Sequence, residues 1–324
     1  YHNYYPGWKK FFNKLGMKVV LSPATNKKIL NQGTKKAVDD LCLPFKIYYG
    51  HVEQLLDKCD YLFVPRIISF GKKNKICPKF MGLPDMLRSV YEKNDKLKLP
   101  SLIAPEIDFR QGLFPLRKIA HQIGKKLDVN YFRIDYALWK ALQEQRQFEA
   151  IQKQGYTPEE SMEILNKNET DKNYKSNCED NTKLKIGLVG HSYIINDDHL
   201  SMNLIQHLRE MSVKVITQDM ISENKIEQAA QRQPKKLFWY FNRQVMGAAY
   251  HMLENCKEKI DGLIQVTSFG CGPDSLIQEL VELRGKYKQS ISLLSLNLDE
   301  HSGQAGLITR LQAFIDLVER RKKA

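Results

Sequence analysis

The stretch Leu184-Lys-Ile-Gly-Leu-Val-Gly190 decides the fold of the second half of the chain. A short, almost wholly apolar run that ends in a glycine turn is typical of a buried strand. A helix is predicted over 201–211, and a second strand follows at Val213-Lys-Val-Ile-Thr217. Strand, helix and strand in this order predict a right-handed crossover between parallel strands. Gly187 and Gly190 lack the third glycine of a dinucleotide fingerprint, so we interpret them as a tight strand-to-helix turn.

The rest of the second half continues this alternation. Strands are predicted at 261–267 and 291–296, and helices at 238–256 and 306–321. Alternating strands and helices predict an open parallel sheet that is covered by helices. Ligands bind outside the carboxyl ends of the strands in such sheets, so the loops after the strands are the expected place for a site.

The first half carries a weaker version of the same pattern. Its predicted strands are 18–22, 61–65 and 101–105, and its predicted helices are 8–15, 26–41, 135–154 and one that starts at the capping-box-like Thr157-Pro158. Residues 166–182 contain almost nothing apolar and are predicted to form a surface linker. We therefore predict an α/β protein with two open, mostly parallel-sheet domains of the Rossmann or flavodoxin type, at 1–165 and 183–324, and a site in the cleft between them.

Length and charge restrict the class of protein. The 324 residues, 42% of them hydrophobic, are enough for two ordinary domains. No apolar run approaches the ~20 residues that span a bilayer, so we expect no membrane association and a cytoplasmic location. The net charge of +13 comes from scattered lysines, without a recognition helix or a basic stripe, so nucleic acid is not an expected partner. The chain starts at Tyr1, and we expect a leading segment to be missing.

Three of the six cysteines have a proline within the next two residues, in Cys42-Leu-Pro44, Cys77-Pro78 and Cys271-Gly-Pro273. Proline bends the chain beside a ligand, and Cys-Pro closes a familiar iron–sulfur binding run. Cys77 and Cys271 each follow a predicted strand, whereas Cys42 is expected at the end of a helix. The pattern indicates a metal cluster held by three thiolates from distant segments. The alternative is three cysteines that pack as small apolar side chains.

The other three cysteines lack this setting. Cys59, Cys178 and Cys256 lie among charged or amide residues and are interpreted as incidental positions. No Cys-x-x-Cys is present to mark a short-range zinc site.

Several segments together resemble a known family. They are Asp40-Leu-Cys42-Leu-Pro-Phe-Lys46 with Gly50-His51-Val52, Cys77-Pro78 with Gly82-Leu-Pro84, Gly187-Leu-Val-Gly-His191-Ser-Tyr193, Ser268-Phe-Gly-Cys271-Gly-Pro-Asp-Ser275, and Asp299-Glu300-His301-Ser302 with Thr309-Arg310. In this order, over nearly the whole chain, they resemble the acyl-CoA dehydratase activase-related family. That family is similar to the iron–sulfur subunits of 2-hydroxyacyl-CoA dehydratases and benzoyl-CoA reductases. Its members usually begin with a short strand that this chain lacks, so the first sheet is expected to miss a strand.

The resemblance implies a [4Fe–4S] cluster held by Cys42, Cys77 and Cys271, with one iron free of cysteine. It further implies a partner activase, an ATPase with its own cluster, that injects a low-potential electron so that a substrate such as a CoA thioester is reduced or dehydrated. The protein would then be a lyase or oxidoreductase of an anaerobic host. The chain has no Gly-x-x-x-x-Gly-Lys-Ser/Thr loop and is not expected to hydrolyse ATP.

Two alternatives to this assignment stay open. The chain would instead be a non-catalytic electron-transfer or scaffold component of a larger activase-related assembly, as one subunit of a homo- or hetero-oligomer. A double-cubane cluster is a second variant, but it would need about six well-placed thiolates, and the position of Cys178 in the polar linker argues against it.

Polar residues near these motifs are the candidate catalytic groups. His191 follows the glycine turn at a strand end and is predicted to donate to a substrate carbonyl or to act as an acid or base, with capping of the next helix as the alternative. Glu300 and His301 follow the strand at 291–296 and form a compact acid and imidazole cluster with Asp299.

Two further residues have more general interpretations. Arg310 is expected to pair with Glu300 or with a phosphate group. His51 would be the fourth ligand if the cysteines formed a Cys₃His zinc site instead of holding iron.

Overall fold

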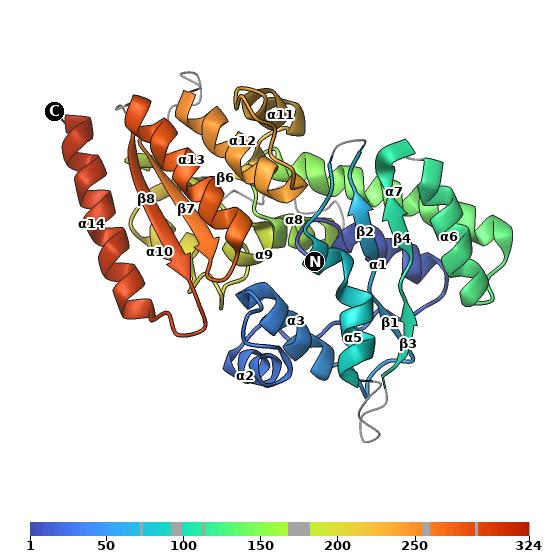
Figure 1. Ribbon diagram of the computed structural model, residues 1–324. Coiled ribbons are helices and arrows are strands. Elements are labelled where there is room, and N and C mark those ends of the chain that lie inside the picture. The colour runs from blue at the N-terminus through green and yellow to red at the C-terminus, as the bar shows by residue number, and fades with distance from the viewer. Residues whose placement is uncertain are drawn as a thin grey trace.

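The computed structural model describes residues 1–71, 74–91, 99–111, 114–167, 182–254, 260–288 and 291–323. The described chain is a mixed α/β protein with short parallel-strand sheets and no closed barrel (Figure 1). Most of the predicted linker at 166–182 lies outside the described residues, and so do Cys178 and Cys256.

The second half is built on one four-stranded parallel sheet. Its elements are β5 (Leu184–Val189), α9 (Ser192–Ile195), α10 (Leu204–Glu210), β6 (Val213–Thr217), a 3₁₀ turn η2 (Gln218–Met220), α11 (Glu223–Ala230), α12 (Tyr240–Glu254), β7 (Gly262–Ser268), α13 (Gly272–Lys288), β8 (Ser292–Leu298) and α14 (Gln304–Lys323). The strand order is β6-β5-β7-β8, and every neighbouring pair is parallel. The predicted strands and the helices between them are thereby confirmed.

Helices cover both faces of this sheet. On β5, Ile186 and Leu188 belong to a core shared with α10 and α14, whereas Val189 belongs to a second core shared with α11, α12 and α13. Successive side chains of a strand point to opposite faces, so a strand buried on both sides reads as a continuous apolar run. Figure 1 shows α14 on one side of the sheet and α12 and α13 on the other.

The first half has fewer and shorter strands. Its elements are α1 (Tyr5–Lys14), α2 (Lys27–Lys36), α3 (Leu43–Glu53), β1 (Tyr61–Phe63), β2 (Arg66–Ser69), α4 (Pro78–Met81), α5 (Leu83–Tyr91), β3 (Ser101–Ile103), β4 (Glu106–Asp108), η1 (Phe109–Gln111), α6 (Phe114–Lys126), α7 (Tyr131–Gln152) and α8 (Pro158–Asn166). Strand β1 pairs in parallel with β3, and β2 with β4. An open multi-stranded sheet was predicted for this half, but the described residues form only these two separate strand pairs.

The prolines explain why the strand pairs are short. Pro65 separates β1 from β2, and Pro105 separates β3 from β4. Proline donates no hydrogen bond to a ladder. The hydrogen bond from Val64 N to the Ile103 carbonyl, 2.9 Å long, continues the pairing between the two segments.

Two local predictions for the first half are wrong. Residues 18–22 form no strand, and Val20 and Leu21 are exposed, because no other described segment pairs with this stretch. Helix α2 ends at Lys36 rather than near Leu41. Cys42 does not end that helix. It occupies the N-cap position of α3, a helix that was not predicted from the sequence.

Helices α2 and α3 approach each other through glycine. A Cβ placed on Gly33 would lie 1.6 Å from the Lys46 carbonyl oxygen, and one on Gly50 would lie 2.0 Å from the Ile29 carbonyl oxygen. Only residues without a Cβ permit this backbone contact. The two glycines therefore fix α2 against the helix that Cys42 begins.

The two halves are joined by direct contacts. The Tyr240 N–H donates to the Lys75 carbonyl at 2.8 Å, and Arg243 donates to the Asn74 side chain at 2.7 Å. On the other side, Lys46 Nζ on α3 lies 2.5 Å from Glu300 Oε1 after β8.

Candidate functional site

The three proline-associated cysteines all stand at the start of a helix. Cys42 is the N-cap of α3, Cys77 is the N-cap of α4, and Cys271 immediately precedes α13. The prolines occupy the first or second position of these helices, where the missing N–H has no partner to lose. The Cys-x-Pro pattern is thus, in the first instance, a pattern of helix starts. Each start also directs backbone N–H groups towards the cysteine, which favours negative charge there.

The structure brings these cysteines together. Cys42 and Cys271 share one apolar cluster on the α3 side, and a Cβ on Gly270 would lie 3.4 Å from Cys42 Cα. Gly270 has φ +78°, a conformation that favours glycine, and it turns the chain after β7 towards α3. Cys77 is close enough for its charge to raise the pKa values of both other cysteines.

Burial and mutual repulsion disfavour the ionised form of the three thiols when no metal is bound. Burial raises the pKa of Cys42, and burial followed by the Asp274 carboxylate and the other two cysteines raises the pKa of Cys271 to about 12. The charge of Lys79 lowers the pKa of Cys42 by less than burial raises it, so both thiols hold their protons at neutral pH. A metal or cluster bound here would replace those protons and offset the repulsion.

The spacing of the sulfurs bears on the kind of metal. Thiolates around a single tetrahedral zinc lie about 3.8 Å apart, as follows from a Zn–S bond of about 2.3 Å. Within the described residues, the group of His, Cys, Asp and Glu donors that all lie within 4.8 Å of one another contains only one of these cysteines. A cubane cluster carries each thiolate on a different iron and so accepts a wider separation.

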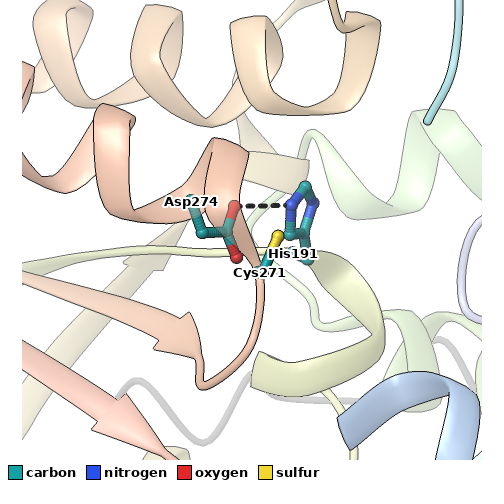
Figure 2. Close-up of side chains that lie close together, drawn as sticks. All are labelled: His191, Cys271 and Asp274. Atoms are coloured by element: carbon teal, nitrogen blue, oxygen red, sulfur yellow. Dashed lines mark ion pairs between the residues drawn. The ribbon is translucent and has the colours of Figure 1, made fainter. Parts of the chain in front are cut away.

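That compact group consists of His191, Cys271 and Asp274 (Figure 2). His191 follows β5 and Cys271 follows β7, and these strands are hydrogen-bonded neighbours, so their carboxyl ends meet at one edge of the sheet. His191 Nε2 lies 2.8 Å from Asp274 Oδ1. Both side chains are almost fully buried.

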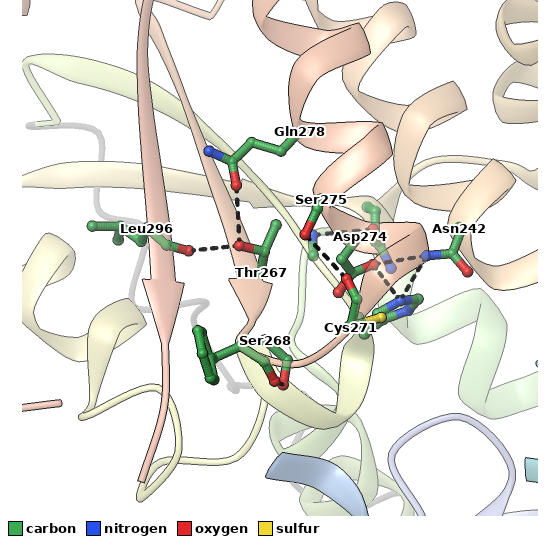
Figure 3. Close-up of polar contacts among 12 residues, drawn as sticks. Asn242, Thr267, Ser268, Cys271, Asp274, Ser275, Gln278 and Leu296 are labelled. Atoms are coloured by element: carbon green, nitrogen blue, oxygen red, sulfur yellow. Dashed lines mark hydrogen bonds and ion pairs between the residues drawn. The ribbon is translucent and has the colours of Figure 1, made fainter. Parts of the chain in front are cut away.

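Asn242 on α12 contacts both members of this pair. Its Nδ2 donates to Asp274 Oδ1 at 2.7 Å and lies 3.3 Å from His191 Nε2 (Figure 3). The second carboxylate oxygen, Asp274 Oδ2, is buried and has no hydrogen-bond partner. Such atoms are rare in folded proteins and point to a missing partner such as an ion.

Asp274 is a site residue that was not predicted from the sequence. It lies in the first turn of α13. The signal that could have found it is a carboxylate three residues after a candidate ligand, Cys271, in a turn that follows a strand.

The other predicted catalytic residues are placed differently. Glu300 pairs with the buried Lys46, and the hydrogen bond from Lys46 lowers the pKa of Glu300. His301 is exposed, and its backbone N–H donates to Asp299. Arg310 donates to the Ser295 carbonyl at 2.7 Å instead of pairing with Glu300.

His51, the alternative zinc ligand, is engaged elsewhere. Its Nδ1 lies 2.8 Å from Ser22 Oγ and its Nε2 lies 3.0 Å from Thr25 Oγ1. Both ring nitrogens therefore have hydrogen-bond partners, which does not favour the Cys₃His site. Cys59, the other cysteine among the described residues, donates to the Leu55 carbonyl at 3.3 Å in the turn that follows α3.

A protein-family model described as the CoA enzyme activase uncharacterised domain matches residues 1–221. The chain belongs to this family. No curated protein matches the chain. The matched part of the CoA enzyme activase domain includes Cys42, Cys77 and His191, and it runs through β5 and β6. None of the described helices has the length and apolar character needed to cross a bilayer.

A cavity of about 350 Å³ lies beside His191 in the activase-family chain. Residues of both halves line it, among them Phe80, His191, Tyr193, Asp219 and Tyr240. Tyr193 stacks on His191, with 4.9 Å between the centroids of the two rings. Burial, with the charge of Asp274 and of the cysteines, raises the pKa of Tyr193, so its phenol stays protonated and can donate.

A second cavity of about 740 Å³ reaches the other side of Phe80 and Tyr193. Carboxylates line both cavities, Asp219 in the smaller one and Asp197 in the larger one. No described lysine or arginine lines either of them. The phosphates of a coenzyme A molecule would therefore find no lysine or arginine inside, so an uncharged portion of such a ligand suits these walls better.

Proposed function

We propose that this CoA enzyme activase domain is an iron–sulfur protein whose Cys42, Cys77 and Cys271 hold one [4Fe–4S] cluster. The observation that carries the proposal is the convergence of three cysteines from three separate helix starts. The raised pKa values of Cys42 and Cys271 fit a group that is completed by positive charge. Three thiolates are a ligand set suited to an iron–sulfur cluster.

A cluster with three cysteine ligands would supply one-electron reduction and an iron with a free coordination position. The partner would be an ATP-dependent activase that delivers low-potential electrons, as related dehydratases use. The substrate is reduced or dehydrated, so the chain would act as an oxidoreductase or lyase. A CoA thioester fits this scheme if its acyl group alone enters the cavity, because no described lysine or arginine lines the cavity to pair with its phosphates.

The chain's own residues would orient the substrate and handle protons. His191 lines the smaller cavity, and its Nε2 is held by Asp274, so Nδ1 is the ring nitrogen that can give or take a proton. Tyr193 can donate a hydrogen bond to a substrate oxygen. Phe80 and Tyr240 supply apolar wall beside that position.

The same cavity supports a catalytic protein over an electron relay or scaffold. A relay needs an exposed cluster edge that faces its partner; Cys42 is only 8% exposed, whereas Cys77 and Cys271 are partly exposed. A pocket beside the proposed cluster is what a substrate requires.

Iron and acid-labile sulfide content, with an EPR spectrum after dithionite reduction, tests the proposal on protein purified without oxygen. We expect about four iron and four sulfide per chain, as a [4Fe–4S] cluster requires. The Cys42→Ser, Cys77→Ser, Cys271→Ser triple variant should lose both, whereas Cys59→Ser should keep them. Folded protein that contains zinc or no metal would refute the cluster and leave three packed cysteines.

A further inference from the structure

The compact donor group at the edge of the four-stranded sheet differs from the cysteine group in its chemistry. His191, Cys271 and Asp274 offer one nitrogen, one sulfur and one oxygen, all within 4.8 Å of one another. Figure 2 shows the three side chains directed towards a common point. This spacing is close to what three ligands of one small ion need, since bonds of about 2.0–2.3 Å place tetrahedral donors between 3 and 4 Å apart.

An unpartnered atom points to a ligand at this place. Asp274 is 3% exposed, and its Oδ2 has no hydrogen-bond partner. Its Oδ1 is already shared between His191 and Asn242. A buried acceptor without a partner destabilises the fold, so an ion bound to Oδ2 would remove that cost.

The backbone holds these donors in place. His191 is the N-cap of α9, and the Cys271 carbonyl accepts from the Ser275 N–H at 3.2 Å in the first turn of α13. Asn242 fixes the carboxylate from α12. Ligands on ordered strand ends with a supporting hydrogen bond are the arrangement of built metal sites.

We propose that His191, Cys271 and Asp274 bind a single divalent ion of the zinc class, with one coordination position left for water or another ligand. Nitrogen, thiolate and carboxylate are the ligand types of tetrahedral zinc, and three protein ligands leave the fourth position open. The inference does not depend on the proposed cluster. Because both use the Cys271 sulfur, the ion and the cluster exclude each other on one chain.

Proton balance follows from the present contacts. The Cys271 thiol loses its proton when the sulfur binds the ion. The 2.8 Å contact between His191 Nε2 and Asp274 Oδ1 is replaced by bonds from both residues to the ion, and the imidazole proton then resides on Nδ1. Asn242 keeps its hydrogen bond to Oδ1.

Titration with Co²⁺ tests this site, because a cobalt–thiolate bond gives a charge-transfer absorption in the near ultraviolet. The full chain is stripped of metal by a chelator under anaerobic, reducing conditions and then titrated. We expect one equivalent of Co²⁺ to produce the band and an equivalent of Zn²⁺ to abolish it. Cys271→Ser should remove the band, and Asp274→Asn or His191→Gln should weaken Co²⁺ affinity by about tenfold or more.

The Cys42→Ser, Cys77→Ser double variant separates the two proposals. It should keep the cobalt band while losing any iron–sulfur cluster, and Asp274→Asn should weaken cobalt binding while keeping the three cluster thiolates. Circular dichroism shows whether each variant is folded. Loss of the cobalt band in the folded double variant, or no band in the folded parent chain, would overturn the single-ion site. Neither result would decide whether iron and sulfide assemble on the parent chain.

Discussion

The two halves of this chain use parallel strands in opposite ways. The second half places β6, β5, β7 and β8 in one sheet and buries both of its faces under helices. The first half has only two strand pairs among its described residues, and its helices supply most of the core. The difference teaches that an apolar run forms a strand only where another segment pairs with it. The site residues follow this division: His191, Cys271 and Asp274 lie in the segments that follow β5 and β7 of the sheet, whereas Cys42 and Cys77 begin helices of the first half.

Leucine truncation in the two strand systems should give the largest difference. Leu188→Ala in β5 removes a side chain that is 0% exposed and enclosed by sheet and helices, so we expect a loss of about 4 kcal/mol in the free energy of unfolding. Leu62→Ala in β1 should cost about 2 kcal/mol, because a two-stranded pair relaxes more easily around the cavity. Urea unfolding measures both. An equal or greater loss at Leu62 would show that the first half is packed as rigidly as the second.

A glycine pair should give the next largest effect. Gly33→Ala forces a Cβ against the Lys46 carbonyl of α3, so we expect about 3 kcal/mol of destabilisation and faster amide exchange in α2 and α3. Gly306→Ala in α14 is the matched control from the second half, where nothing lies within 4 Å of the added Cβ. It should stabilise by about 0.5–1 kcal/mol, because alanine favours helix. Destabilisation of similar size in both variants would contradict the proposed contact.

The ion pair between the halves should have the smallest effect, with a defined pH dependence. Lys46 lowers the pKa of Glu300 in the folded state, so the unfolded state binds more protons in mild acid. The pair's contribution is therefore complete above the ordinary pKa of 4.5 and is lost as pH falls through the lower folded value.

Lys46→Met should cost about 1–2 kcal/mol at pH 7 and flatten this acid dependence, as urea unfolding between pH 3 and 7 would measure. Lys10→Met is the control, since the Lys10 and Glu144 pair lies within the first half and is more exposed. It should cost less than about 1 kcal/mol. If the free energy of unfolding of Lys46→Met fell with pH as steeply as that of the parent chain, the pairing of Glu300 with Lys46 would not contribute to the acid dependence of stability.

The sequence by itself determined the second half almost completely. Apolar runs such as 184–189, with turns and helices between them, predict buried parallel strands because such strands need no partner beyond their own sheet. The glycine turn before His191 and the loop that carries Cys271 were also placed correctly after their strands. For this part, local pattern and global fold agree.

Only the tertiary structure decided the first half and the composition of the site. Residues 18–22 have the apolar pattern of a strand, but a strand forms only when another segment supplies its hydrogen bonds. The meeting of Cys42, Cys77 and Cys271 and the pairing of Asp274 with His191 join residues that are far apart in the chain. Sequence spacing carries no information about such contacts, because they depend on how sheet edge and helix starts pack in space.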